Sequence, residues 1–200
     1  IKFDDNTITK KHADKLKKAF KLSLRKLGRQ KSYALLFHQS CDILKPGANY
    51  LIDAVNELKS DNLIDKFGVS IYHGDPIDRI TQVLAPNIVQ LPFSLFDQRF
   101  LRDGTLTELS RINIEIHARS LFLQGLPFLK PSKLPKYFRP WLEIFQNFSF
   151  DCDYKNIAPD VVCTSFINSI SEIDGCVVGF NSKEEIDRFF TNLSQPFISH

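Results

Sequence analysis

Five short apolar runs recur along the chain with helix-like segments between them, and this alternation constrains the fold more than any other feature. The runs have the length of buried β-strands and span residues 33–37 (YALLF), 67–70 (FGVS), 87–91 (NIVQL), 113–118 (NIEIHA) and 175–178 (GCVV). In βαβ units the helices cover both faces of the sheet, so its strands become continuously apolar. The pattern therefore predicts an α/β fold with a parallel sheet.

The segments between these runs have helical signals. We expect helices over residues 49–58, 76–84, 101–109, 141–147, 158–170 and 182–193, and a Pro-rich excursion over residues 126–140. Another helix precedes the first strand, because Ala13, Leu16, Phe20, Leu24 and Leu27 recur at spacings of three and four. Gly28 is a typical stop signal for that helix.

The first helix carries most of the basic charge of the chain. Residues 1–31 hold 11 Lys and Arg against 3 Asp, although the whole chain has a formal net charge of only +3. The polar face of this helix has no aromatic, Asn or Gln side chain that reads or stacks on bases. We therefore interpret it as a solvated face and expect no nucleic-acid partner.

Several classes of protein are disfavoured by what the sequence lacks. No apolar run approaches the roughly 18 to 20 residues of a membrane helix, so we expect no membrane partner. Neither GxGxxG nor GxxxxGK[ST] follows a strand, the histidines lack metal-ligand spacing, and GxSxG is absent. The four cysteines lie too far apart for CxxC, and we expect reduced, buried thiols in a cytoplasmic protein.

Polar residues lie at or directly after the ends of the apolar runs, where the strands should end. Ser70 ends one run and Gln90 lies within another, and His38, Arg119, Ser120 and residues 179–182 (GFNS) follow the other three. In a parallel barrel the carboxyl ends of all strands meet at one mouth, so these residues are predicted to share a pocket. The alternative is that each of them only marks where the chain exits to solvent. Taken singly, His38 could be a buried histidine satisfied by a neighbouring carbonyl, and His117, inside a strand, is expected to be one.

These motifs resemble the aldo/keto reductase superfamily. The resemblance runs from about Lys10 to Leu193 and includes SLRKLG, LLFH, FGVS, NIVQLPFSLFDQRF, HARS.FLQGL and VVGFNS, in that order. It implies an eight-stranded TIM barrel, of which residues 1–200 would form a single domain, the C-terminal portion with strands four to eight. The sequence starts at Ile1 and contains no Met. We therefore expect the first three strands to come from a longer parent chain or from a partner.

The resemblance implies an NAD(P)-dependent oxidoreductase that transfers a hydride to a small-molecule carbonyl, in carbohydrate biosynthesis on a sugar-like substrate. His38 matches the histidine that orients the carbonyl oxygen. The family's catalytic Tyr and Asp would precede Ile1, and Lys2 is a candidate for its Lys. The alternative is a catalytically degraded barrel that binds the nicotinamide cofactor or serves as a structural module.

The resemblance also implies which residues bind NADP or NAD. Ser70 and Gln90 match positions that hold the nicotinamide carboxamide, and Ser120 and Phe122 match the pyrophosphate loop. The adenosine phosphate end would be held by Gly179, Phe180, Asn181 and Ser182. Three positions depart from the family pattern. Ile71 replaces an Asn, Arg119 replaces a stacking Tyr, and Glu185, near the usual Arg, weakens the preference for NADP.

Overall fold

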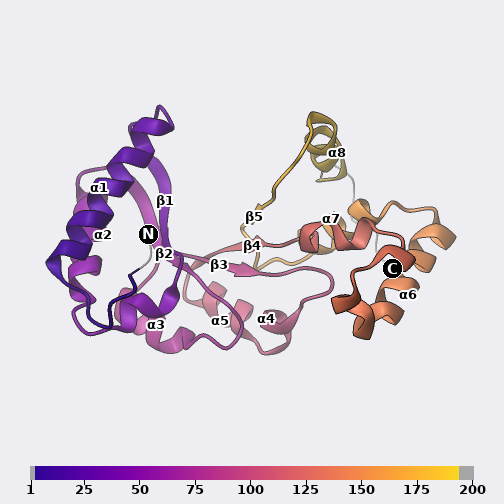
Figure 1. Ribbon diagram of the computed structural model, residues 1–200, viewed down its shortest axis with the longest axis horizontal. Helices are drawn as coiled ribbons and strands as arrows, with labels where there is room; N and C mark the ends of the chain where they lie inside the picture. Colours follow the sequence, from indigo (N-terminus) through magenta and orange to yellow (C-terminus); the bar gives the residue numbers. More distant parts are fainter. Residues whose placement is uncertain (1–2, 194–200) are drawn as a thin grey trace. The chain divides into compact units, whose positions relative to one another are not determined.

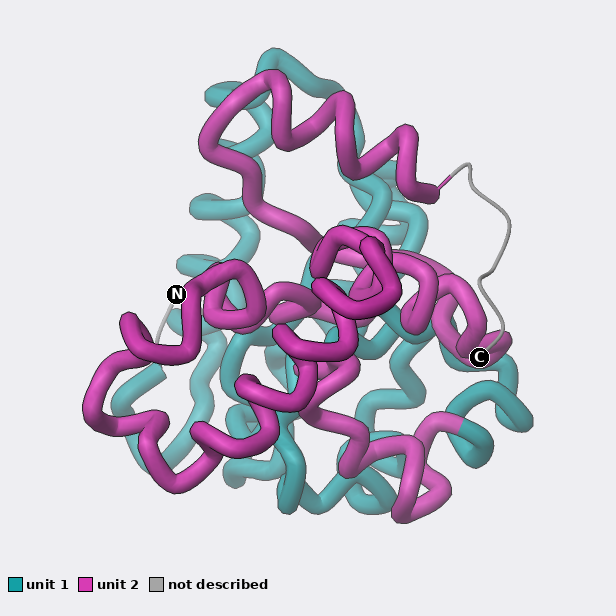
Figure 2. The backbone as a smooth tube through the Cα atoms, turned by 90° about the vertical axis from the view of Figure 1, so that its right-hand side faces the viewer, with its two compact units in different colours: residues 1–91, 107–117 teal, residues 92–106, 118–200 magenta. Residues whose placement is uncertain are grey.

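A computed structural model describes residues 3–193, and the chain separates into two compact units (Figure 2). Unit 1 comprises residues 1–91 and 107–117, and unit 2 comprises residues 92–106 and 118–200. The expectation of a single domain stays a prediction. Each unit is described by itself below.

The chain folds into one five-stranded sheet with helices between successive strands, which confirms the predicted α/β class (Figure 1). The strands follow chain order and are β1 (Ser32–Phe37), β2 (Ile64–Ser70), β3 (Ile88–Pro92), β4 (Glu115–Arg119) and β5 (Gly175–Val177). β2 pairs with β1 and with β3, both in parallel. The helices are α1 (Lys10–Lys26), α2 (Asn49–Ser60), α3 (Ile77–Leu84), α4 (Arg99–Arg102), α5 (Thr105–Arg111), α6 (Leu142–Lys155), α7 (Pro159–Asn168) and α8 (Lys183–Leu193).

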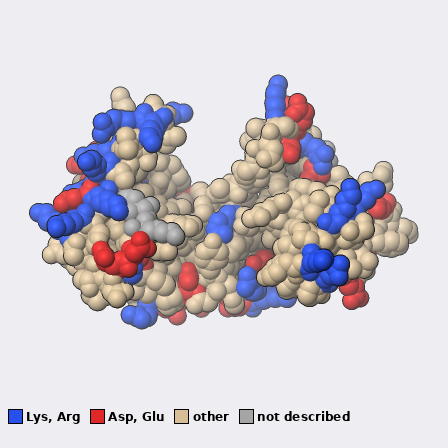
Figure 3. Space-filling model, viewed as in Figure 1, with Lys and Arg blue, Asp and Glu red and all other residues tan. Residues whose placement is uncertain are grey.

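Helix α1 buries the predicted apolar stripe, with one exception. Ala13, Leu16, Phe20 and Leu24 are buried, whereas Leu27 is 69% exposed. Leu27 is the C-cap, and Gly28 follows it with φ +63°. The N–H of Arg29 then donates to the carbonyl of Leu24 at 3.0 Å, so the chain turns away before Leu27 reaches the core. In unit 1, Lys and Arg gather over α1, as the prediction of a solvated basic face requires (Figure 3).

A glycine allows β2 and β3 to approach each other. Gly68 lies opposite Ile88, and a Cβ at Gly68 would lie 1.6 Å from the Ile88 carbonyl oxygen. No other residue fits there without separating the strands. In the next register position Val69 faces Val89, and both are fully buried.

The predicted single helix over residues 101–109 is wrong, because the structure forms two helices there. Gly104 adopts φ +82° between α4 and α5, which ends the first helix. The Asp103 carboxylate accepts the N–H of Thr105 at 3.0 Å and so caps the second.

The predicted Pro-rich excursion lies in unit 2 and contains three short 3₁₀ turns. They are η2 (Leu123–Phe128), η3 (Pro131–Lys133) and η4 (Lys136–Trp141). Its core is aromatic. Phe93 stacks on Phe166 at 5.8 Å between ring centroids, and Phe96 stacks on Phe145 at 5.0 Å. The buried Asp160 of α7 accepts hydrogen bonds from Arg188 and Asn192 of α8 and joins the two helices.

The cysteine prediction is partly wrong. All four thiols are free, but only Cys152 and Cys163 are buried, while Cys41, in a 3₁₀ turn after β1, and Cys176, in β5, are exposed. Between residues 3 and 193, no helix has both the length and the apolar character needed to cross a membrane. Over the same residues, no three His, Cys, Asp or Glu side chains are grouped so that they could hold a metal ion.

Candidate active site

Three predicted site residues lie at the carboxyl ends of neighbouring strands in unit 1. Ser70 and Gln90 are direct partners in the β2–β3 register, so their side chains project from the same face of the sheet. His38 directly follows Phe37, which pairs with Val69, the residue before Ser70. The structure therefore brings His38, Ser70 and Gln90 to one level at one edge of the sheet.

The three residues differ in exposure. His38 is exposed, and it lies at a cavity of about 170 Å³ that is lined mostly by residues of α1 and β1. Gln90 is half-buried, and Ser70 is only 4% exposed. Of the three, His38 is therefore the most accessible to solvent.

The Ser70 hydroxyl is buried and has no hydrogen-bond partner among the described residues. A buried polar group without a partner costs about 1 to 3 kcal/mol. A ligand amide at this edge would satisfy the hydroxyl. The residues present thus fit the carboxamide that the resemblance places beside Ser70 and Gln90.

The remaining predicted site residues lie in unit 2, and the first group follows β4. The carbonyl of Arg119 accepts the N–H of Phe93 at 3.0 Å. Ser120 is exposed and adopts φ +65°, a left-handed conformation that is uncommon outside glycine. Leu123 and Gln124 also have positive φ. This concentration of unusual backbone is typical of functional loops.

The structure brings two predicted loops of unit 2 together through one aromatic ring. Phe122 contacts Phe189 of α8 edge to face, at 6.1 Å between centroids. Phe180 contacts the same ring at 5.3 Å. The loops after β4 and β5, about sixty residues apart in the chain, therefore share Phe189. Phe189 was not predicted as a site residue, because its position in the sequence indicates only one face of an amphipathic helix.

The start of α8 is closed by its own side chains. The backbone N–H of Asn181 donates to the Glu185 carboxylate at 2.8 Å, and the N–H of Glu185 donates to the Ser182 hydroxyl at 3.2 Å. The second bond is one half of a capping box, whereas the Glu185 carboxylate binds the residue before the N-cap Ser182. Hydrogen bonds from its own backbone N–H and from Ser182 lower the pKa of Glu184, so a second carboxylate occupies this helix start.

The predicted site residues divide between the two units. Unit 1 holds His38, Ser70 and Gln90, and unit 2 holds Arg119, Ser120, Phe122 and residues 179–182. Within each unit the structure brings them together as described. Convergence of the two groups on one pocket stays a prediction, and Lys2 lies outside the described residues.

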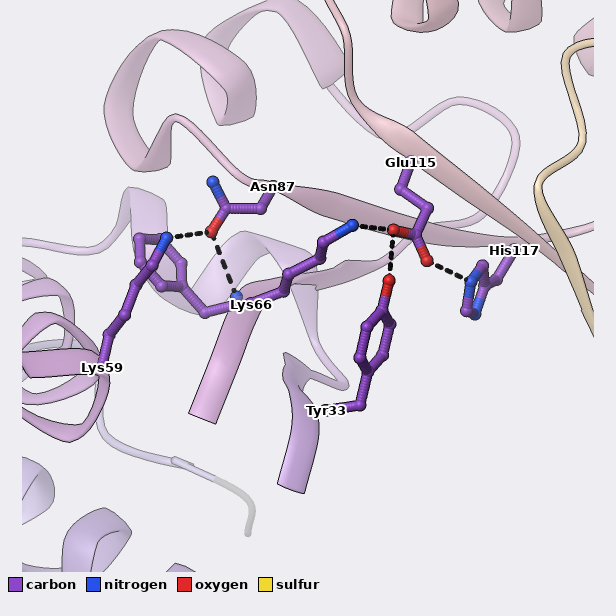
Figure 4. Close-up of polar contacts among 7 residues, drawn as sticks. Tyr33, Lys59, Lys66, Asn87, Glu115 and His117 are labelled. Carbon is purple, nitrogen blue, oxygen red and sulfur yellow. Dashed lines mark hydrogen bonds and ion pairs between the residues drawn. The ribbon is translucent and has the colours of Figure 1, made fainter. Parts of the chain in front are cut away.

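A polar network at the opposite, amino end of the strands in unit 1 is shown in Figure 4. The half-buried carboxylate of Glu115 on β4 pairs with Lys66 of β2, accepts a hydrogen bond from the hydroxyl of Tyr33 at 2.6 Å, and contacts the His117 ring nitrogen at 2.6 Å. Burial raises the pKa of Glu115, but the hydrogen bonds from Lys66, Tyr33 and His117 outweigh it and lower the pKa. The hydrogen bond to Glu115 raises the pKa of Lys66 well above its usual value.

The position of this network indicates a structural role. It lies beside a cavity of about 530 Å³ among the starts of β2, β3 and β4, lined by Lys59 and Asn87, whose side chains are joined at 2.9 Å. In (βα) barrels the amino end of the strands serves stability and the carboxyl end serves chemistry. His117 is hydrogen-bonded within this network, but it is half-buried and its partner is a carboxylate instead of the expected neighbouring carbonyl.

Comparison with solved structures identifies the class of fold. The chain superimposes on the apo form of the aldo-keto reductase AKR11C1 from Bacillus halodurans with a TM-score of 0.76 and 16% sequence identity, over 96% of this chain and 66% of that one. For the holo form of the same enzyme the TM-score is 0.73, over 98% and 65%. The glycerol dehydrogenase AKR11B4 from Gluconobacter oxydans gives 0.64 at 16% identity, over 96% and 66%.

These matches confirm the predicted fold, which is that of part of an aldo-keto reductase TIM barrel. The chain spans slightly less than two thirds of the length of these structures. Neither a scan against family models nor a search of curated proteins gives a match.

Proposed function

We propose that the complete protein is a nicotinamide-dependent oxidoreductase of the aldo-keto reductase type that reduces a carbonyl group. The observation that carries this proposal is the Ser70 hydroxyl, buried without a partner and in register with Gln90 at the sheet edge beside His38. The fold of the neighbours supports the same class of activity. The rest of the barrel would come from the parent chain or from a partner, and we propose a cytoplasmic location.

His38 is the proposed catalytic residue of this chain, because its exposed ring is accessible to a substrate. It would hold and polarise the carbonyl oxygen by donating a hydrogen bond. A bound nicotinamide supplies the hydride that the carbonyl carbon accepts. The proton for the carbonyl oxygen would come from the tyrosine that the resemblance implies, assisted by an Asp and by a Lys, for which Lys2 is the candidate.

The proposed cofactor contacts are the residues that the resemblance implies. Ser70 and Gln90 would bind the carboxamide, and Ser120 and Phe122 the pyrophosphate. Gly179, Phe180, Asn181 and Ser182 would surround the adenosine end, and Arg119 would supply a cation to the nicotinamide or the substrate. The exposed Ser120 hydroxyl supports the pyrophosphate contact, because a hydroxyl can donate a hydrogen bond to an anion.

We propose NAD rather than NADP as the preferred cofactor. The Glu185 carboxylate already accepts the N–H of Asn181, which a 2′-phosphate would otherwise use. A carboxylate at this position repels a phosphate but accepts a hydrogen bond from a ribose hydroxyl. For the substrate we propose a sugar-like or polyol-derived carbonyl. The name of one structural neighbour, a glycerol dehydrogenase, supports that class.

Titration of the complete protein with NADH and NADPH tests this proposal. We expect binding of at least one cofactor, measured by calorimetry or as a rise in melting temperature, with NADH about tenfold tighter. A tenfold difference corresponds to about 1.4 kcal/mol, in the range of one like-charge contact near a surface. Absence of binding of either cofactor at millimolar concentration contradicts the proposed function. Binding without reduction of any aldehyde or ketone would instead support the degraded module.

A further inference from the structure

One carboxylate joins the two loops that follow β1 and β2 in unit 1. Oδ2 of Asp75 accepts the hydroxyl of Ser40 at 2.7 Å and the backbone N–H of Tyr72 at 3.0 Å. Ser40 belongs to the loop after β1, and Tyr72 to the loop after β2. The Ser40–Asp75 bond links residues 35 positions apart in the chain.

The two groups that Asp75 binds have matching places in the sequence relative to the candidate site. Ser40 lies two residues after His38, and Tyr72 lies two residues after Ser70. One oxygen atom therefore joins the two loops within two residues of each site residue.

Asp75 is itself held firmly. Its N–H donates to the carbonyl of Tyr72 at 3.1 Å, and its carbonyl accepts the N–H of Ile77, the first residue of α3, at 2.8 Å. Ser40 is 4% exposed and begins the 3₁₀ turn η1 (Ser40–Leu44), which packs against α3. The bond between them is thus partly shielded from water, which makes it stronger than a fully exposed one.

We propose that Asp75 is a positioning residue, which fixes the His38 ring relative to the nicotinamide edge at Ser70. This inference rests on the proposed function, since it assumes that His38 orients the carbonyl and that Ser70 holds the carboxamide. In hydride transfer, a misplacement of about 1 Å lowers the rate by about a hundredfold. Loss of the Asp75 bonds therefore lowers kcat and leaves the affinity for the cofactor nearly unchanged.

The experiment compares Asp75→Ala, Asp75→Asn and Ser40→Ala in the complete protein. The assay follows oxidation of the preferred cofactor with an aromatic aldehyde such as 4-nitrobenzaldehyde. We expect Asp75→Ala to lower kcat by about 10- to 100-fold and to change the cofactor dissociation constant by less than about twofold. Asp75→Asn keeps an oxygen that accepts both hydrogen bonds, so it should retain most of the activity. Ser40→Ala removes one bond and should give an intermediate loss.

A double-mutant cycle with His38→Ala separates positioning from a general effect on folding. If Asp75 acts through His38, Asp75→Ala causes no further loss of kcat in the His38→Ala background. The matched control is Asp78→Ala, an exposed carboxylate in the first turn of α3, which should leave kcat unchanged. If Asp75→Ala does not fold, the same cycle with Ser40→Ala gives the test.

Equal losses of kcat in both backgrounds would overturn the inference, as would an unchanged kcat for both Asp75→Ala and Ser40→Ala. Failure of the proposed function has a different signature, because the unsubstituted protein then neither binds nor oxidises the cofactor. In that case the inference falls with it.

Discussion

Among the residues of the candidate site, Ser70 gives the strongest indication of a ligand. Its hydroxyl is buried without a partner, whereas the equally buried Ser94 accepts the N–H of Asp97 at 3.1 Å. We therefore expect Ser70→Ala to leave the free energy of unfolding unchanged or about 1 kcal/mol higher, and Ser94→Ala to lower it by about 1 kcal/mol. Denaturant unfolding without ligand measures both.

Calorimetry of Ser70→Ala should show cofactor binding weakened by about tenfold. Cofactor affinity equal to that of the unsubstituted protein would argue against a ligand at this hydroxyl.

Local sequence patterns reveal some of these residues and not others. His38, Ser70 and Gln90 were predictable because each follows or ends an apolar run, and such runs mark buried strands. Asp75 gave no signal, because its partner Ser40 lies far away in the chain and loop aspartates are common. The left-handed conformation of Ser120 was equally invisible, since it is imposed by the loop around it and not by the residue type.

At the scale of elements, the Glu115 network joins β1, β2 and β4 at the amino end of the sheet. The pKa of Glu115 is lower in the folded protein than its usual value of 4.5. The carboxylate therefore stabilises the fold above about pH 4.5, and this contribution is lost as the pH falls through the lowered pKa. We expect Glu115→Gln to lower the free energy of unfolding at pH 7 by about 1 to 3 kcal/mol, and to flatten its decline in acid. Urea unfolding at several pH values measures both effects.

The exposed Glu108 of α5 provides the control for that series, because Glu108→Gln should change neither the stability nor its pH dependence. If the free energy of unfolding of Glu115→Gln fell in acid as steeply as that of the unsubstituted protein, the result would contradict the structural role of the network. From the sequence, β4 was predicted as a strand with His117 inside it, but the pairing of Lys66 with Glu115 was not. Two charges separated by 49 residues become neighbours only through the order of the strands.

Element boundaries show the same limit. The apolar runs located all five strands, and Gly28 marked the end of α1 correctly. Gly104 was included in one long predicted helix, although its left-handed backbone and the cap from Asp103 divide that segment in two. Glycine within a helical pattern is ambiguous until its φ is known, because it is tolerated in helices at a cost of about 1 kcal/mol.

For the whole molecule, the central prediction is that the complete protein binds a nicotinamide cofactor. A ligand at 100 times its dissociation constant stabilises a protein by about 2.7 kcal/mol. We expect the cofactor to stabilise the complete protein by about this amount, and Ser70→Ala to reduce that gain by about half at the same cofactor concentration. Denaturant unfolding with and without the cofactor measures the gain. A gain that is insensitive to Ser70→Ala would argue against a ligand at the Ser70 hydroxyl.

The ring of Phe189 serves two loops of unit 2 at once. Phe122 and Phe180 each contact this one side chain, from loops about sixty residues apart in the chain. Replacing Phe189 by a small side chain removes both contacts together, so a single substitution in α8 affects both loops.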